Sequence, residues 1–145
     1  MATYEFVPEL GHQLDAPLAT EADKAAAQLK VRLEVLGLTN DHFQVSVENG
    51  RVIVTGDAAI QEQKEKILLA LGNVAGVSEV EDRVDVGQEG ITPRFVTVRE
   101  GESLADLAER VYGDTEATGK LLKANHPLLT CPEDAFEGLV LRAPH

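Results

Sequence analysis

The sequence predicts an α+β protein made of two small domains. Three observations support this fold class: a helix–strand–strand–helix–strand pattern over residues 18–87, a linker-like composition over 88–93, and a strand–helix–helix–strand pattern over 94–145. The 145 residues are enough for two units of this size. Residues 1–17 precede them as an N-terminal arm.

The arm carries a short apolar cluster interrupted by prolines and a glycine, so we expect it to dock on a neighbouring surface. A one-turn helix and an irregular wrap are both allowed. Its apolar side chains are Tyr4, Phe6, Val7, Leu10 and Leu14.

The first unit opens with a helix. Thr20 and Asp23 resemble a capping arrangement at its start, apolar residues then recur at helical spacing, and the pattern ends near Gly37. Alternation over 43–48 and the dipeptide Asn49-Gly50 predict a hairpin. A two-residue turn places three pairs of residues opposite each other across the strands: Val47 and Val52, Val45 and Val54, and Glu48 and Arg51.

A second helix is predicted from Ile60 to Leu71, and it stops at Gly72. Valines at positions 80, 84 and 86 then indicate a third strand, which places both helices on one face of the sheet. A solvated strand face is the simplest interpretation of the acidic residues among them, Glu79, Glu81, Asp82 and Asp85.

The second unit begins with a strand over 95–98. Ser103 is a good N-cap for a helix that Tyr112-Gly113-Asp114 ends. Another helix follows from about Glu116 to Ala124, and the apolar run 139–141 closes the unit as the partner strand.

The segment from Leu71 to Val77 is a candidate cation environment. A helix that ends on Gly72 leaves its last carbonyls without helical partners, and the dipole places about half a negative charge there. A further glycine, Gly76, follows, and together Gly72 and Gly76 give the backbone freedom to bend. An ordinary helix stop is the simpler interpretation of the same residues, because glycine ends many helices.

Charge and composition exclude several classes of partner. The formal net charge of −12 repels nucleic acid and anionic lipid. We see no export signal and no apolar run of bilayer length, so we expect a cytoplasmic protein without a membrane partner. Cys131 is the single cysteine, which suits a reducing compartment. We expect a monomer.

Neither catalysis nor a transition-metal site is indicated. The four histidines, His12, His42, His126 and His145, are scattered, whereas zinc and copper sites need several ligands at short spacing. The acidic residues near position 80 lack the pattern of a calcium loop. Ser103, Thr55 and Cys131 belong to no recognisable nucleophile motif, so we expect a binding protein rather than an enzyme.

The second unit resembles a LysM domain. The resemblance rests on the run 95–104 (FVTVREGESL), on Tyr112-Gly113, on Asn125 and Pro127, and on the closing run 138–141 (GLVL). Glu137-Gly138-Leu139 stands where Pro-Gly-Gln is common in that family, in the loop before the last strand.

The first unit resembles a BON domain through the runs 45–47 (VSV), 52–56 (VIVTG) and 72–77 (GNVAGV). A BON unit followed by a LysM unit, with an apolar N-terminal arm, is similar to the small bacterial potassium-binding proteins of this architecture. The resemblance covers nearly the whole chain.

This resemblance implies a protein that binds K⁺ in preference to Na⁺ and becomes more compact with the ion bound, as a sensor or a buffer. The ligands in that family are main-chain carbonyl oxygens. Carried over by position, they come from Val7, Leu10 and His12 in the arm and from Gly72, Val74 and Val77 in the turn.

Two other functions remain open. A LysM-type unit could recognise peptidoglycan or another chitin-like glycan, with the BON unit as an adaptor, although this would need export. The protein could also be a scaffold that meets an unidentified protein partner through its LysM-like face.

Overall fold

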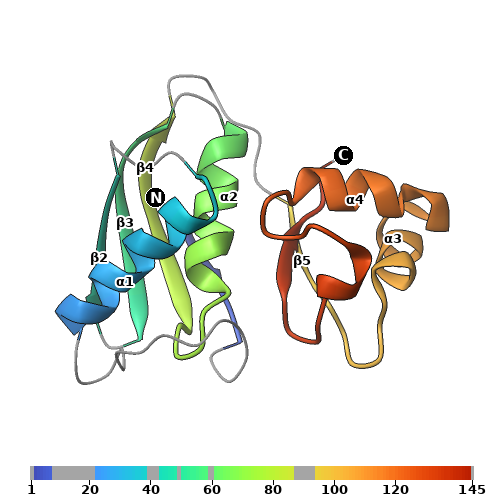
Figure 1. The fold of residues 1–145 in the computed structure, drawn as a ribbon, viewed down its shortest axis with the longest axis horizontal. Coiled ribbons are helices and arrows are strands. Elements are labelled where there is room, and N and C mark those ends of the chain that lie inside the picture. Colours follow the sequence, from blue (N-terminus) through green and yellow to red (C-terminus); the bar gives the residue numbers. More distant parts are fainter. Residues whose placement is uncertain are drawn as a thin grey trace.

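The computed structural model describes residues 2–7, 22–38, 43–48, 50–58, 61–86 and 94–144. Within them the protein is α+β, as predicted, with a four-stranded sheet in the first unit and a two-stranded sheet in the second (Figure 1). The elements of the first unit are β1 (Ala2–Glu5), α1 (Ala22–Val35), β2 (Phe43–Glu48), β3 (Arg51–Ala58), α2 (Gln61–Gly72) and β4 (Glu79–Val86).

The sheet of the first unit has the order β1-β4-β3-β2. The hairpin register is as predicted, because Val47 faces Val52 and Val45 faces Val54. β4 runs parallel to β3, and α2 connects the two strands. β1 was not predicted: it pairs antiparallel with the outer edge of β4, so the start of the arm is a strand and not a helix or an irregular wrap.

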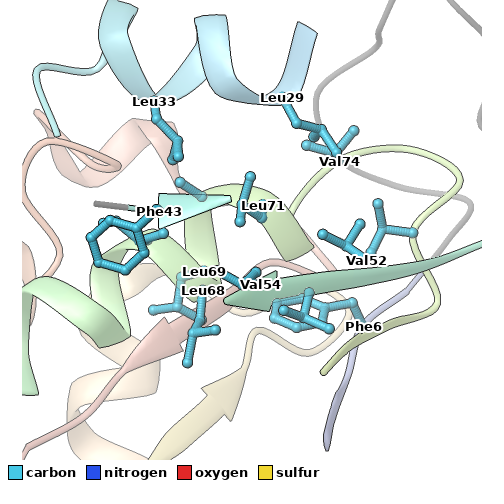
Figure 2. Packing of buried hydrophobic residues seen from close by; sticks show 14 of the residues in the cluster. Phe6, Leu29, Leu33, Phe43, Val52, Val54, Leu68, Leu69, Leu71 and Val74 are labelled. Carbon is cyan, nitrogen blue, oxygen red and sulfur yellow. The ribbon is translucent and has the colours of Figure 1, made fainter. Parts of the chain in front are cut away.

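Both helices cover one face of this sheet, as predicted, and the core lies between the layers (Figure 2). Its largest fully buried members include Leu29 and Leu33 of α1, Phe43 of β2 and Leu68 of α2. Apolar residues at helical spacing on α1 and at alternate positions on β3 meet here, which is how the sequence pattern becomes a core.

Asp82 corrects the prediction of a uniformly solvated acidic strand. It lies on the helix-facing side of β4 with only 4% of its surface exposed, and its carboxylate pairs with Lys64 of α2 at 2.8 Å. A buried charge needs such a partner, because burial removes its hydration. Glu79 lies on the other face of β4 and pairs with Arg51 of β3 at 3.0 Å.

The second unit follows the predicted order. It contains β5 (Phe95–Thr97), α3 (Leu104–Tyr112), a short 3₁₀ turn η1 (Thr115–Ala117), α4 (Thr118–Ala124), a second turn η2 (Pro132–Asp134) and β6 (Val140–Arg142). Ser103 caps α3 in a reciprocal capping box with Asp106. None of the helices that the structure describes has the length and apolarity to span a bilayer.

The two units are in contact through α2, which lies between the four-stranded sheet and β6 (Figure 1). Val140 of β6 belongs to the core of the first unit, and Tyr4 of β1 meets Phe95 of β5 edge-on with ring centroids 4.9 Å apart.

The Glu102–Arg110 pair gives the second unit a defined response to acid. Hydrogen bonding to the Arg110 side chain lowers the pKa of Glu102 to about 2. A carboxyl group with a depressed pKa contributes stability above its normal pKa of about 4.5, and this contribution is lost as the pH falls towards 2. We therefore expect Glu102→Gln to be less stable than the wild type in urea unfolding at pH 7, with the difference shrinking as the pH falls from about 4.5 to about 2.

Glu100→Gln is the matched control, because this neighbouring carboxylate is exposed. A stability difference for Glu102→Gln that does not change with pH would contradict the assignment.

Candidate metal centre

The turn between α2 and β4 is closed by a main-chain hydrogen bond and packs against the core through its valines. Val77 donates its N–H to the carbonyl of Val74 at 3.1 Å, and the side chains of both valines are fully buried. Gly76 has φ +96°, a conformation that strains other residues, so its predicted backbone role is confirmed. The left-handed Gly76 and the Val74–Val77 hydrogen bond therefore define the conformation of the turn.

Gly72 has a different role from the one predicted. It is the last residue of α2, and its importance lies in the missing side chain rather than in a bend. A Cβ atom on Gly72 would lie 2.1 Å from Cζ of Phe6. The Phe6 ring thus packs directly on the main chain at the helix end.

The arm reaches the turn by continuing the β1–β4 pairing. Phe6 donates its N–H to the carbonyl of Ser78 at 2.9 Å, and only 7% of Phe6 is exposed. Val7 follows directly and is half-buried. Among the predicted ligands, the structure brings Val7 to the same region as Gly72, Val74 and Val77; Leu10 and His12 lie outside the described residues.

The β2–β3 hairpin supports the turn from another side. The carbonyl of Gly50 accepts hydrogen bonds from the N–H of Ser78 at 3.0 Å and from its hydroxyl at 3.3 Å. A Cβ on Gly50 would lie 3.4 Å from the Gly76 oxygen. Strand pairing and hairpin packing therefore fix the turn together.

The second unit contacts the turn through a side-chain amide. Asn73 donates from Nδ2 to the Val140 carbonyl at 2.8 Å, and its Oδ1 accepts the Val140 N–H at 2.9 Å. Nearby, Arg142 of β6 pairs with Glu65 of α2 at 3.2 Å, where both side chains are buried. The candidate centre thus lies where the arm, the first unit and the second unit meet.

The donor chemistry of this region is that of neutral oxygen atoms. No group of three or more His, Cys, Asp or Glu side chains that could hold a metal occurs within the described ranges. The last turn of α2 contains no basic residue of its own, while Arg32 of α1 donates from Nε to the Ala70 carbonyl at 3.2 Å. Burial lowers the pKa of Arg32. The helix end can therefore present carbonyl dipoles to a cation, with one guanidinium close by.

Comparison with known proteins agrees with this architecture. A family model of the BON domain matches residues 21–88. The chain is also 33% identical over 147 residues to the potassium binding protein Kbp of Escherichia coli O6:H1, covering 99% of both chains. This chain belongs to the Kbp family.

In this Kbp family member the BON match starts after β1 and Phe6, so the arm lies outside the matched range. Sequence reasoning missed three features of the centre: the Phe6–Gly72 contact, the Asn73–Val140 pair and the Glu65–Arg142 pair. Asn73 is a polar residue within the largely apolar run 67–77, and this was the signal from which the Asn73–Val140 pair could have been expected.

The Phe6–Gly72 contact predicts a strong coupling between two substitutions. Gly72→Ala should expel the Phe6 ring and cost about 1.5–3 kcal/mol of unfolding free energy, the value of burying such a side chain. In a Phe6→Ala background the same change should cost much less, because the ring is absent. Denaturant unfolding of both single variants and the double variant measures this coupling.

Gly119→Ala provides the control. Gly119 is also helical, and a Cβ there meets nothing within 4 Å. We expect it to be neutral or stabilising by about 0.5–1 kcal/mol. Additive effects at Phe6 and Gly72 would contradict the proposed contact.

Proposed function

We propose that this protein binds K⁺ at the junction of the arm and the turn after α2. The ligands would be the main-chain carbonyl oxygens of Val7, Leu10 and His12 from the arm and of Gly72, Val74 and Val77 from the turn. The observation that carries the proposal is the packing of Phe6 on Gly72, because it brings the arm to the end of α2. The relative named as a potassium binding protein supports the choice of ion.

The chemistry of the region suits a monovalent cation. Carbonyl dipoles can replace the hydration shell of K⁺, as they do in channel filters. Magnesium and calcium sites usually include carboxylates, and no group of three or more acidic, His or Cys side chains is found in the part of the chain that the structure describes. The Val74 oxygen, although it accepts the Val77 N–H, keeps a second lone pair for an ion.

Binding would stabilise the arrangement in which arm, turn and second unit are packed together. An ion shifts such an equilibrium only by the difference between its affinities for the packed and the loosened states. We propose on this basis a K⁺ sensor or buffer that becomes more compact when the ion binds. The strand–helix–helix–strand order of residues 94–145 supports a LysM-like second unit. The single cysteine agrees with a cytoplasmic location.

The proposal predicts a response to K⁺ that Na⁺ does not produce. At a hundredfold excess over the dissociation constant, K⁺ should stabilise the protein by about 2.7 kcal/mol. We expect a higher melting temperature and a smaller radius of gyration in K⁺ than in Na⁺ at equal ionic strength. Calorimetry and small-angle scattering measure the two quantities. Equal responses to both ions would refute a selective site.

A backbone substitution should separate the site from general stability. Gly76→Ala forces a side chain into a left-handed conformation, which costs about 1–2 kcal/mol and shifts the turn carbonyls. We expect its K⁺ affinity to fall by at least tenfold. Gly113→Ala is the matched control, because Gly113 has φ +74° at the end of α3 and a Cβ there meets nothing within 4 Å. It should lose comparable stability and keep its K⁺ affinity, and equal affinities in the two variants would contradict the assignment.

A further inference from the structure

On the outer edge of β6, side-chain amides form the hydrogen bonds that a neighbouring strand would otherwise form. β5 pairs antiparallel with one edge of β6, and the 2.9 Å bond from the Val98 N–H to the Leu139 carbonyl continues this pairing just beyond the two strands. On the opposite edge, the Asn73 amide pairs with both main-chain groups of Val140, and the Asn125 amide pairs with both groups of Arg142. Asn125 belongs to the second unit, whereas Asn73 belongs to the first.

Asn73 stands between two of the proposed ligand residues, Gly72 and Val74. Its own N–H donates to the Leu69 carbonyl at 3.0 Å, so its main chain continues the hydrogen bonding of α2 beyond the helix end. Only 6% of Asn73 is exposed. A change in the main chain of the turn therefore moves an amide whose partners lie on the second unit.

We propose that Asn73 is the positioning residue through which the second unit responds to K⁺ in the turn. The inference rests on the proposed function and names the residue that would transmit binding. When the carbonyls of Gly72 and Val74 are held by the ion, the Asn73 amide is fixed in the orientation that pairs with Val140. When these carbonyls are not held by the ion, the hydrogen bonds between Asn73 and Val140 weaken, and the edge of β6 is released from the turn.

The other described polar contacts between the units, from Arg142 to Glu62 and Glu65, are less suited to this role. Glu65 meets Arg142 from a position two helical turns before Gly72, within regular helix, so its place does not depend on the turn. The Glu65–Arg142 pair holds the units together in either state. Among the residues that make the described polar contacts between the units, Asn73 is the one that also belongs to the turn.

The test uses the full chain and three variants: Asn73→Ala, Asn73→Asp and, as a control at the same interface, Glu65→Gln. Hydrogen exchange at the Val140 amide reports directly on the Asn73 pair, and the Val98 amide, which bonds within the second unit, is the internal reference. Small-angle scattering and K⁺ titration are measured on the same samples, with Na⁺ as the comparison ion.

In the wild type we expect K⁺ to increase the protection of the Val140 amide, with little change at Val98. Asn73→Ala should lose that increase, because it removes both bonds and leaves buried main-chain groups unpaired, which lowers the ratio of packed to loosened molecules by about tenfold or more. The K⁺ affinity of Asn73→Ala should fall by no more than this change in the packing ratio, since ion binding and packing affect each other by the same free energy. Glu65→Gln should loosen the interface in both ions and keep the increase that K⁺ produces.

Asn73→Asp tests the pairing itself, because it keeps the size and shape of the side chain. Its carboxylate has no N–H to donate to the Val140 carbonyl. We expect the K⁺-dependent protection of Val140 to be lost in this variant, as in Asn73→Ala, with the wild type measured alongside.

The outcomes separate the two proposals. If the wild type binds K⁺ and the Asn73 variants keep the full K⁺-dependent protection and compaction, the role of Asn73 is refuted and the ion site stands. If the wild type itself shows no response specific to K⁺, both proposals fall. Loss of the response in both Asn73 variants, while Glu65→Gln keeps it, supports the inference.

Discussion

The contact between the Phe6 ring and the bare main chain of Gly72 organises the centre of this protein. It is possible only because Gly72 lacks a Cβ, and it closes the space where the arm, the end of α2 and the start of β4 converge. The β1–β4 hydrogen bonds bring Phe6 to this point, and the hairpin glycine Gly50 supports the turn from the other side. Local backbone geometry, strand pairing and core packing therefore depend on one another here.

An ion site made of main-chain oxygens places few demands on the side chains of a sequence. A carboxylate site leaves a visible set of acidic side chains, whereas a carbonyl site needs only a backbone held in the right conformation. In the proposed site, the backbone conformation depends on a glycine with positive φ at position 76, on the missing Cβ at position 72 and on two buried valines. The strongly acidic composition adds a favourable field for any cation.

The sequence predicted those parts of the fold whose causes are local. Asn49-Gly50 determined the hairpin register, and Ser103 marked the start of α3. It did not predict β1, because the alternation over four residues is too short to indicate a strand, and these residues become one only by pairing with the edge of β4. Asp82 was misplaced for a similar reason, since its buried position depends on Lys64 of another element.

The candidate site was predicted in part. The glycines and the helix end are visible in the sequence, but the Asn73–Val140 pair joins residues 67 positions apart, and no local pattern encodes it. The ligand assignment stays a prediction for all six residues, which are Val7, Leu10, His12, Gly72, Val74 and Val77.

The position of β1 at the margin of the sheet has a consequence for self-association. β1 is short and pairs with residues 79–82, the first half of one edge of β4. Without it, the N–H and C=O groups of this half would also be unpaired, and an unpaired strand edge is a template for pairing with another chain. The arm therefore also protects the protein against intermolecular sheet growth, and exchange of β1 between two copies would satisfy the same hydrogen bonds in a dimer.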